Sequence, residues 1–176
     1  AECLFALVAI RHVRQLDDAD EGRHGLSLVG RDQLMRIPPD APEIVLDDYA
    51  RQDAPHRYFK NKSGGLGQYY FGPLRDLRIL DHSPGGPGLP PGYDRERGAR
   101  LADAFGAGVP GDAFFRILEA ASLKWTDLDE LAPFCPCGLV GNAVEHSLLL
   151  DLFLARSDAF KAEGWQARQA SIRLML

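Results

Sequence analysis

The stretch CLFALVAIRHVRQL, residues 3–16, decides the fold class of this 176-residue chain. On a helix, its apolar residues lie on every side as far as Ile10 and afterwards only at Val13 and Leu16, which is typical of a buried helix whose end reaches solvent. The unbroken apolar run is eight residues long, far shorter than the roughly 20 residues of a membrane-spanning helix. The stretch therefore predicts a helix in the core of a globular protein without a membrane segment.

Cysteine usage and composition favour a cytoplasmic protein. The chain has three cysteines, an odd number, and they are spread too widely for the disulfide framework of a small secreted domain. With 45% hydrophobic and 26% charged residues, the chain is long enough to bury a core without covalent cross-links. We therefore expect a cytoplasmic globular protein.

Helical periodicity and capping residues continue along most of the chain. Asn142, with Glu145 three residues later, resembles a capping box at the start of a helix, and Gly164 separates the last helix from the preceding segment. Prolines and Ser or Asp caps bound most of the other segments. The sequence predicts helices over residues 27–37, 42–54, 72–80, 93–105, 113–123, 143–154 and 165–176.

The segment His56–Leu80 is locally basic in an acidic chain. It contains five Lys and Arg residues and one acidic residue, Asp76, whereas the whole chain has a net charge of −5. Aromatic residues alternate with the basic ones, and the glycines of Gly64–Gly67 allow backbone N–H groups to approach phosphate oxygens closely. The combination is typical of a contact with a nucleic-acid backbone. In the alternative, the basic side chains solvate a loop or pair with acidic residues, while Leu74 and Leu77 belong to the core.

Residues 66–105 resemble the winged helix-turn-helix superfamily, through two motifs within residues 74–102. LRDLRIL, residues 74–80, is followed by a Pro/Gly-rich stretch and then by YDRERGARLA, residues 93–102, in the order of a recognition helix, a β-hairpin wing and a further helix. Arg78 stands where that family often has glycine. In the family, the recognition helix enters the major groove and the wing contacts the backbone. The residues that the resemblance implies face DNA are Gln68, Tyr69 and Arg75.

Together these patterns predict a mainly α fold in three consecutive parts. Residues 1–55 form an N-terminal helical part. Residues 56–106 form a winged-helix-like unit with a short β-hairpin wing and the basic segment. Residues 107–176 form a C-terminal helical extension, and the resemblance itself spans about residues 66–105.

A zinc site would need more ligands than the sequence Cys135-Pro136-Cys137 and His146 provide. Structural zinc sites usually pair their cysteines as C-x2-C to C-x4-C, and the C-x-C spacing here is shorter. Cys3 is a ligand only if the fold brings it close, and Glu145 is the sole other nearby group. Because free cysteine is among the most buried residue types, we predict buried thiols, no stoichiometric zinc and no cofactor.

The sequence predicts no catalytic residues. Ser147 directly follows His146, and adjacent residues on a helix point to different faces. The Gly64–Gly67 stretch lacks the Gly-Lys-Ser/Thr ending of a phosphate-binding loop. We therefore expect that the protein is not an enzyme.

Two functions are compatible with these features. The first is an accessory module of a larger bacterial complex that contacts nucleic acid, chiefly the DNA backbone, weakly and without sequence preference. The second is a structural or scaffolding subunit, for example of a phage-defence complex, whose apolar N-terminal helix and apolar end Leu174–Leu176 pack against other protein subunits. For the first function, the predicted nucleic-acid-binding residues are Arg57, Lys60, Lys62, Gln68, Tyr69, Arg75 and Arg78.

Overall fold

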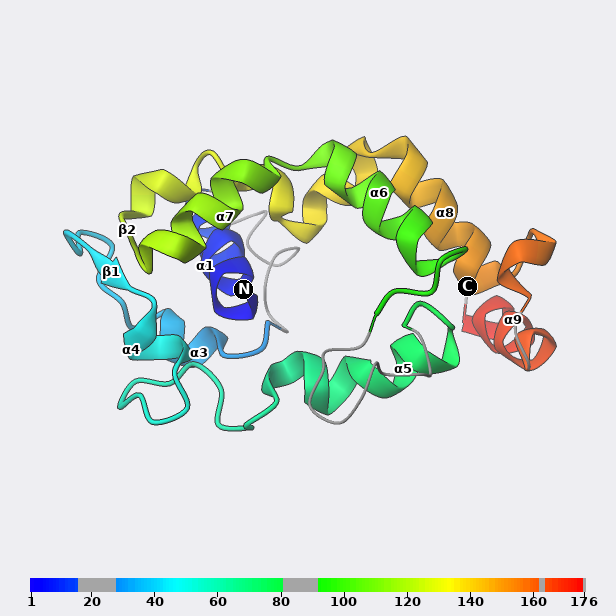
Figure 1. The fold of residues 1–176 in the computed structure, drawn as a ribbon, viewed down its shortest axis with the longest axis horizontal. Coiled ribbons are helices and arrows are strands. Elements are labelled where there is room, and N and C mark those ends of the chain that lie inside the picture. The colour runs from blue at the N-terminus through cyan, green and yellow to red at the C-terminus, as the bar shows by residue number, and fades with distance from the viewer. Residues whose placement is uncertain (16–27, 81–91, 162–163, 176) are drawn as a thin grey trace. The chain divides into compact units, whose positions relative to one another are not determined.

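Helices make up most of the structure, a computed structural model that describes residues 1–15, 28–80, 92–161 and 164–175 (Figure 1). The prediction of a mainly α fold with a C-terminal helix is confirmed. Within the described ranges, no helix is both long enough and apolar enough to cross a bilayer.

The chain forms two compact units, and each unit combines two separate segments of sequence. Unit 1 contains residues 1–68 and 109–138, and unit 2 contains residues 69–108 and 139–176. The division cuts across the three consecutive parts predicted from the sequence, because each unit packs together residues that are distant along the chain.

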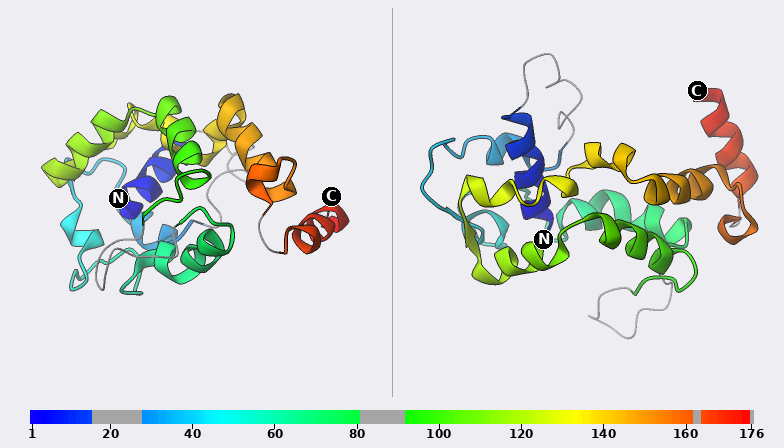
Figure 2. Two further views of the ribbon diagram at one scale, coloured as in Figure 1. Left: turned by 45° about the vertical axis from the view of Figure 1, so that its right-hand side comes forward. Right: turned by 90° about the horizontal axis from the view of Figure 1, so that it is seen from above.

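Helix α1 (Glu2–Val13) is central to unit 1. Every residue from Leu7 to Ile10 is buried. The helix contacts α3 (Arg31–Leu34), η2 (Trp125–Leu128) and η3 (Ala132–Phe134), and both views of Figure 2 show α1 beside the yellow segment that carries η3. The predicted buried helix is therefore confirmed. A helix that is apolar on all sides is stable where neighbouring elements cover every side.

Three phenylalanines join α1 to the second segment of unit 1. The ring centroids of Phe5 and Phe114 are 4.9 Å apart, and those of Phe114 and Phe134 are 4.8 Å apart. Phe5 also meets the ring of Phe134 edge-on, at 5.4 Å. Because Phe114 belongs to α7 (Gly111–Ala120) and Phe134 to η3, the aromatic cluster holds both elements against α1.

A short antiparallel ladder also joins the two segments of unit 1. Strand β1 (Ile44–Val45) pairs with β2 (Ser122–Leu123), and Ile44 lies opposite Leu123. Ile44 is buried and Val45 is exposed, which is the alternation of a strand with one face on a core. β-branched residues are well suited to this arrangement.

The ladder corrects two sequence predictions. The helix predicted over residues 42–54 is wrong at its start, and α4 (Asp47–Ala50) is the part of it that is helical. The helix predicted over residues 113–123 is α7, which ends at Ala120. In both places, pairing between distant strands outweighs local helical periodicity.

Unit 2 is built around α6 (Gly98–Gly108) and α8 (Ala143–Leu154), which lie side by side (Figure 1). Its core contains Leu101, Leu152 and Phe160, with other leucine and isoleucine side chains packed around them. Phe160 belongs to the short 3₁₀ turn η5 (Asp158–Phe160).

Side chains form hydrogen bonds with backbone groups at both ends of α8. At the start, Asn142 Oδ1 accepts a hydrogen bond of 3.1 Å from the Glu145 N–H, so the predicted cap is confirmed. At the end, Arg168 and Gln169 of α9 (Trp165–Met175) donate side-chain hydrogen bonds to carbonyls of the last turn of α8. The predicted boundaries of α8 are correct; the cap at its start is local, whereas the partners of its last turn come from α9.

Helix α5 (Phe71–Asp76) follows directly after the π-helical turn η1 (Leu66–Tyr70). It ends earlier than the helix predicted over residues 72–80. Arg78 then adopts a left-handed backbone conformation, with φ 54°. A left-handed residue just beyond a helix end is a common C-terminal cap and is usually glycine.

A bridge between Leu80 and Tyr93 closes the loop between α5 and α6. These two residues pair in antiparallel fashion, and the N–H of Asp94 donates to the carbonyl of Ile79 at 2.9 Å. Residues 81–91, where the sequence predicts the tip of a wing, lie outside the described ranges.

Candidate functional site

The predicted nucleic-acid-binding residues belong to both units. In unit 1, Lys60, Lys62 and Gln68 are exposed. Arg57 is half-buried, and its guanidinium donates to two backbone carbonyls of its own loop at 3.2 and 2.8 Å. Because Arg57 closes this loop, we leave it out of the nucleic-acid interface proposed below.

The glycine-rich loop holds a carboxylate of the same chain. The Gly65 N–H donates to the carboxylate oxygens of Glu2 at 2.9 and 3.1 Å, and the Leu66 N–H donates to one of them at 3.4 Å. Gly64 has φ 68°, and a Cβ at Gly64 or Gly65 would collide with this carboxylate. The amides of Gly65 and Leu66 are therefore occupied by Glu2, and the predicted approach of this loop to a phosphate is wrong for these two groups.

In unit 2, the predicted residues lie on η1, on α5 and just beyond it. Tyr69 is 51% exposed. The Arg75 guanidinium lies 5.7 Å from the ring centroid of Phe71, and Arg75 is half-buried. Arg78 is exposed and immediately precedes the hydrogen-bonded residue Ile79.

Two further exposed arginines lie on the other side of the same junction. Arg95 directly follows Asp94, whose N–H donates to Ile79, so Arg78 and Arg95 flank one backbone hydrogen bond. Arg100 is exposed on the first part of α6, and its guanidinium lies 5.9 Å from the ring centroid of Phe160. We call Arg78, Arg95 and Arg100 the α5–α6 arginines.

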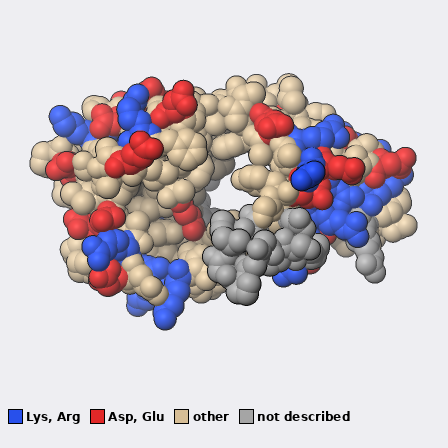
Figure 3. Space-filling model, viewed as in Figure 1, with Lys and Arg blue, Asp and Glu red and all other residues tan. Residues whose placement is uncertain are grey.

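The neighbouring charged groups have structural roles. Arg97 is 8% exposed, and its guanidinium donates to the carbonyl of Ala159. The carboxylate of Asp94 accepts hydrogen bonds from the N–H groups of Glu96 and Arg97 at 3.0 and 2.8 Å, in the turn that precedes α6. Within the described ranges, the α5–α6 arginines take part in no ion pair. Figure 3 shows basic and acidic side chains intermixed, so the face drawn there is not uniformly basic.

Polar side chains fix the C-terminal end of α1 in unit 1. Arg11 donates to both carboxylate oxygens of Asp129, at 2.7 and 3.0 Å, and these hydrogen bonds lower the pKa of Asp129. The guanidinium of Arg14 lies 4.4 Å from the ring centroid of Trp125. These contacts hold the last turn of α1, which carries His12, against the second segment of unit 1.

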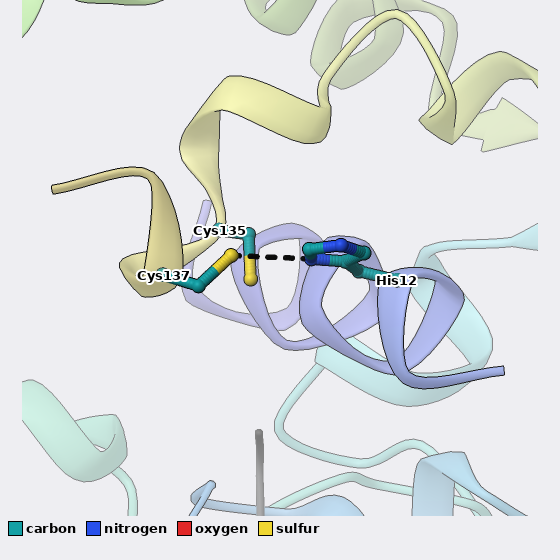
Figure 4. Close-up of side chains that lie close together, drawn as sticks. All are labelled: His12, Cys135 and Cys137. Carbon is teal, nitrogen blue, oxygen red and sulfur yellow. Dashed lines mark hydrogen bonds between the residues drawn. The ribbon is translucent and has the colours of Figure 1, made fainter. Parts of the chain in front are cut away.

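His12 meets two cysteines at this end of α1 (Figure 4). Its Nδ1 lies 3.3 Å from the Sγ of Cys137. The ligand atoms of His12, Cys135 and Cys137 all lie within 4.8 Å of one another. Cys135 is buried, whereas His12 and Cys137 are half-buried. We call these three residues the thiol–imidazole cluster.

A tight turn places the two thiols close together. The Gly138 N–H donates to the Cys135 carbonyl at 2.9 Å, with Pro136 as the second residue of the turn. Proline suits this position because its ring presets φ near −65°. The turn directly follows Phe134, whose ring is anchored in the aromatic cluster, so the position of the thiols relative to α1 is set by core packing.

The Cys137 thiol has a raised pKa. Burial raises its pKa to about 11, and a hydrogen bond with Cys135 acts in the same direction. Reactive cysteines have the opposite property, a lowered pKa that supplies thiolate. A raised pKa does not favour a nucleophilic thiolate, whereas the convergence of three ligand atoms within 4.8 Å suits metal binding.

His12 is the residue that the sequence analysis missed. It lies 125 positions from Cys137, and no spacing pattern links the two. His146, considered above as a ligand, is exposed on α8 in unit 2, and Cys3 is buried at the opposite end of α1. His12 can be predicted as a ligand only if it is known that α1 packs against the segment that contains the cysteines.

No family model matches the chain, and neither the curated proteins nor the solved structures searched contain a match.

Proposed function

We propose that unit 2 contacts the phosphate backbone of nucleic acid through the α5–α6 arginines. The proposal depends on two exposed arginines next to one backbone hydrogen bond. Ile79 and Asp94 form this bond, Arg78 immediately precedes Ile79, and Arg95 immediately follows Asp94. A guanidinium group is planar, always charged, and can donate two parallel N–H bonds to phosphate oxygens. Two such groups held at one backbone junction suit neighbouring phosphates of one strand.

The winged helix-turn-helix resemblance favours the same surface. The Leu80–Tyr93 bridge follows α5 at the point where a wing would begin. Arg78 has a positive φ at the position where the family often has glycine. In this proposal, Tyr69, Arg78 and Arg95 contact the backbone, while Arg75 and Arg100, whose guanidinium groups lie near aromatic rings, contribute less.

The expected binding is weak and independent of sequence. The chain has a net charge of −5, and unit 2 contains as many acidic as basic residues, so long-range attraction to nucleic acid is small. Contacts confined to phosphates carry no base information. We expect a dissociation constant in the non-specific range of about 10⁻⁴ to 10⁻⁶ M at physiological salt.

Replacing Arg78 and Arg95 together by glutamate is expected to weaken binding to a labelled DNA duplex and to reduce its salt dependence. Each phosphate contact contributes a log–log slope of roughly −0.9, so losing two contacts makes the slope shallower by about 1.8. The measurement is a fluorescence anisotropy titration of the wild type and the double variant at several salt concentrations. The same titration with a single strand tests the preference for duplex.

A matched control comes from unit 1. Arg36→Glu with Arg51→Glu changes the net charge equally at two exposed positions outside His56–Leu80, and binding should change little. Lys60→Glu with Lys62→Glu tests whether the exposed lysines of unit 1 take part. If the wild type does not bind at about 50 mM salt, or if the control variant loses as much affinity as Arg78→Glu with Arg95→Glu, phosphate contact at this junction is wrong.

A second candidate function, a scaffolding contact with protein, is favoured by the composition of α8. Leu150, Phe153 and Leu154 follow helical spacing; Phe153 is 43% exposed, whereas Leu150 and Leu154 are half-buried. Exposed apolar side chains on one helix face are typical of protein interaction surfaces. We expect the isolated protein to self-associate or to have low solubility. Phe153→Asp should then reduce the self-association or raise the solubility, as measured by light scattering. A monodisperse monomer whose solubility is unchanged by Phe153→Asp would exclude this function.

A further inference from the structure

We propose that His12, Cys135 and Cys137 bind one zinc ion, with water as the fourth ligand. The proposal is independent of the nucleic-acid contact, because the thiol–imidazole cluster belongs to unit 1 and the α5–α6 arginines to unit 2. The proposal also differs from the sequence-based prediction of no stoichiometric zinc, because that prediction did not consider His12 as a ligand.

The spacing of the ligand atoms is close to that of a zinc site. With Zn–S bonds of about 2.3 Å and Zn–N bonds of about 2.0–2.1 Å, tetrahedral geometry separates ligand atoms by about 3.5–3.8 Å. Here Nδ1 of His12 and Sγ of Cys137 are 3.3 Å apart, and no pair among the three ligand atoms exceeds 4.8 Å. Shifts of a few tenths of an ångström to about one ångström therefore bring the three groups to bonding geometry.

The donor set selects the metal. Thiolate and imidazole are preferred ligands of Zn²⁺, whereas Mg²⁺ and Ca²⁺ require oxygen donors. When zinc binds, each of the two thiols releases its proton to solvent, and the two thiolates neutralise the two positive charges of the ion. A neutral site can be accommodated where Cys135 is buried.

Water is the natural fourth ligand because the cluster reaches the surface of the unit. His12 and Cys137 are half-buried, so solvent can approach the ion from their side, while Cys135 closes the other side. Three protein ligands and one exchangeable position are the arrangement of an open zinc site.

The surrounding structure holds the ligands in place before metal arrives. The hydrogen bonds between Arg11 and Asp129 fix the last turn of α1, and the turn from Cys135 to Gly138 fixes both thiols. Because the ligands are distant in the sequence, the ion would cross-link α1 to the second segment of unit 1.

The test is a titration of the reduced, metal-free full chain with Zn²⁺ and, as a coloured probe, with Co²⁺. We expect one equivalent of either metal to bind, Co²⁺ to give thiolate-to-metal charge-transfer absorption, and Zn²⁺ to raise the thermal midpoint of unfolding. Cys137→Ser and His12→Gln should each lower zinc affinity by more than about 100-fold, since loss of an outer-shell partner alone costs about 10–100-fold.

Matched controls are present in the same chain. Cys3→Ala removes a buried cysteine outside the cluster, and His146→Gln removes an exposed histidine of unit 2; both variants should bind zinc like the wild type. Circular dichroism checks that each variant is folded, and the two half-buried ligands are chosen because Cys135→Ser risks unfolding the protein. The proposal is wrong if the metal-free protein binds neither ion, if bound Co²⁺ shows no thiolate absorption, or if the control and cluster variants lose affinity equally.

Discussion

Gly98→Ala is expected to lower the free energy of unfolding of the protein by about 3 kcal/mol, at the upper end of the usual cost of overpacking. A Cβ at position 98 would overlap the backbone carbonyl oxygen of Ile79 and press on Tyr93. The same carbonyl accepts the hydrogen bond from Asp94. A backbone atom cannot rotate away as a side chain can, so the junction between α5 and α6 must open.

Gly106→Ala in the same helix is the matched control. No atom lies within 4 Å of a Cβ built at Gly106, and alanine has the better helix propensity, so stability should stay equal or rise by about 0.5–1 kcal/mol. Urea denaturation followed by circular dichroism measures both variants. Equal stability of Gly98→Ala and Gly106→Ala would contradict the described packing of α6 against Ile79.

Leu7→Ala is expected to cost about 3 kcal/mol of unfolding free energy, within the range of about 2–5 kcal/mol for truncating a buried leucine. Leu7 is 0% exposed in the middle of α1, between elements that come from both segments of unit 1. The lost contacts and the remaining cavity both contribute to the cost.

The control for Leu7→Ala is the same substitution at an exposed leucine. Leu174 of α9 is 88% exposed, so Leu174→Ala should change the unfolding free energy by less than about 0.5 kcal/mol. Chemical denaturation of both variants under identical conditions gives the comparison. A cost for Leu7→Ala no larger than that for Leu174→Ala would mean that α1 is not the centre of the unit 1 core.

Patterns that act within one helix were predictable from the sequence. The uninterrupted apolar run before Arg11 requires burial wherever it packs, which is why α1 was predicted correctly. The start of α8 was predictable because Asn142 and Glu145 satisfy the first turn of their own helix. In these cases the partners are at most four residues apart.

Local patterns failed where a distant partner decides the structure. The neighbours of Ile44 and Val45 in the sequence are compatible with a helix, but antiparallel pairing with Ser122–Leu123 makes these two residues a strand. The glycines after Asn61 suit an anion, but the carboxylate that their loop holds is that of Glu2. Neither partner can be identified from residues nearby in the sequence.

The amino-acid sequence by itself determined that this protein is mainly helical, that α1 is buried and where α8 begins, because each depends on periodicity or capping within a few residues. Tertiary structure alone decided the two interleaved units, the strand pairing and the meeting of His12 with Cys135 and Cys137. The physical reason is that side chains 125 positions apart, as His12 and Cys137 are, come together only when the helices and turns that carry them pack into one core.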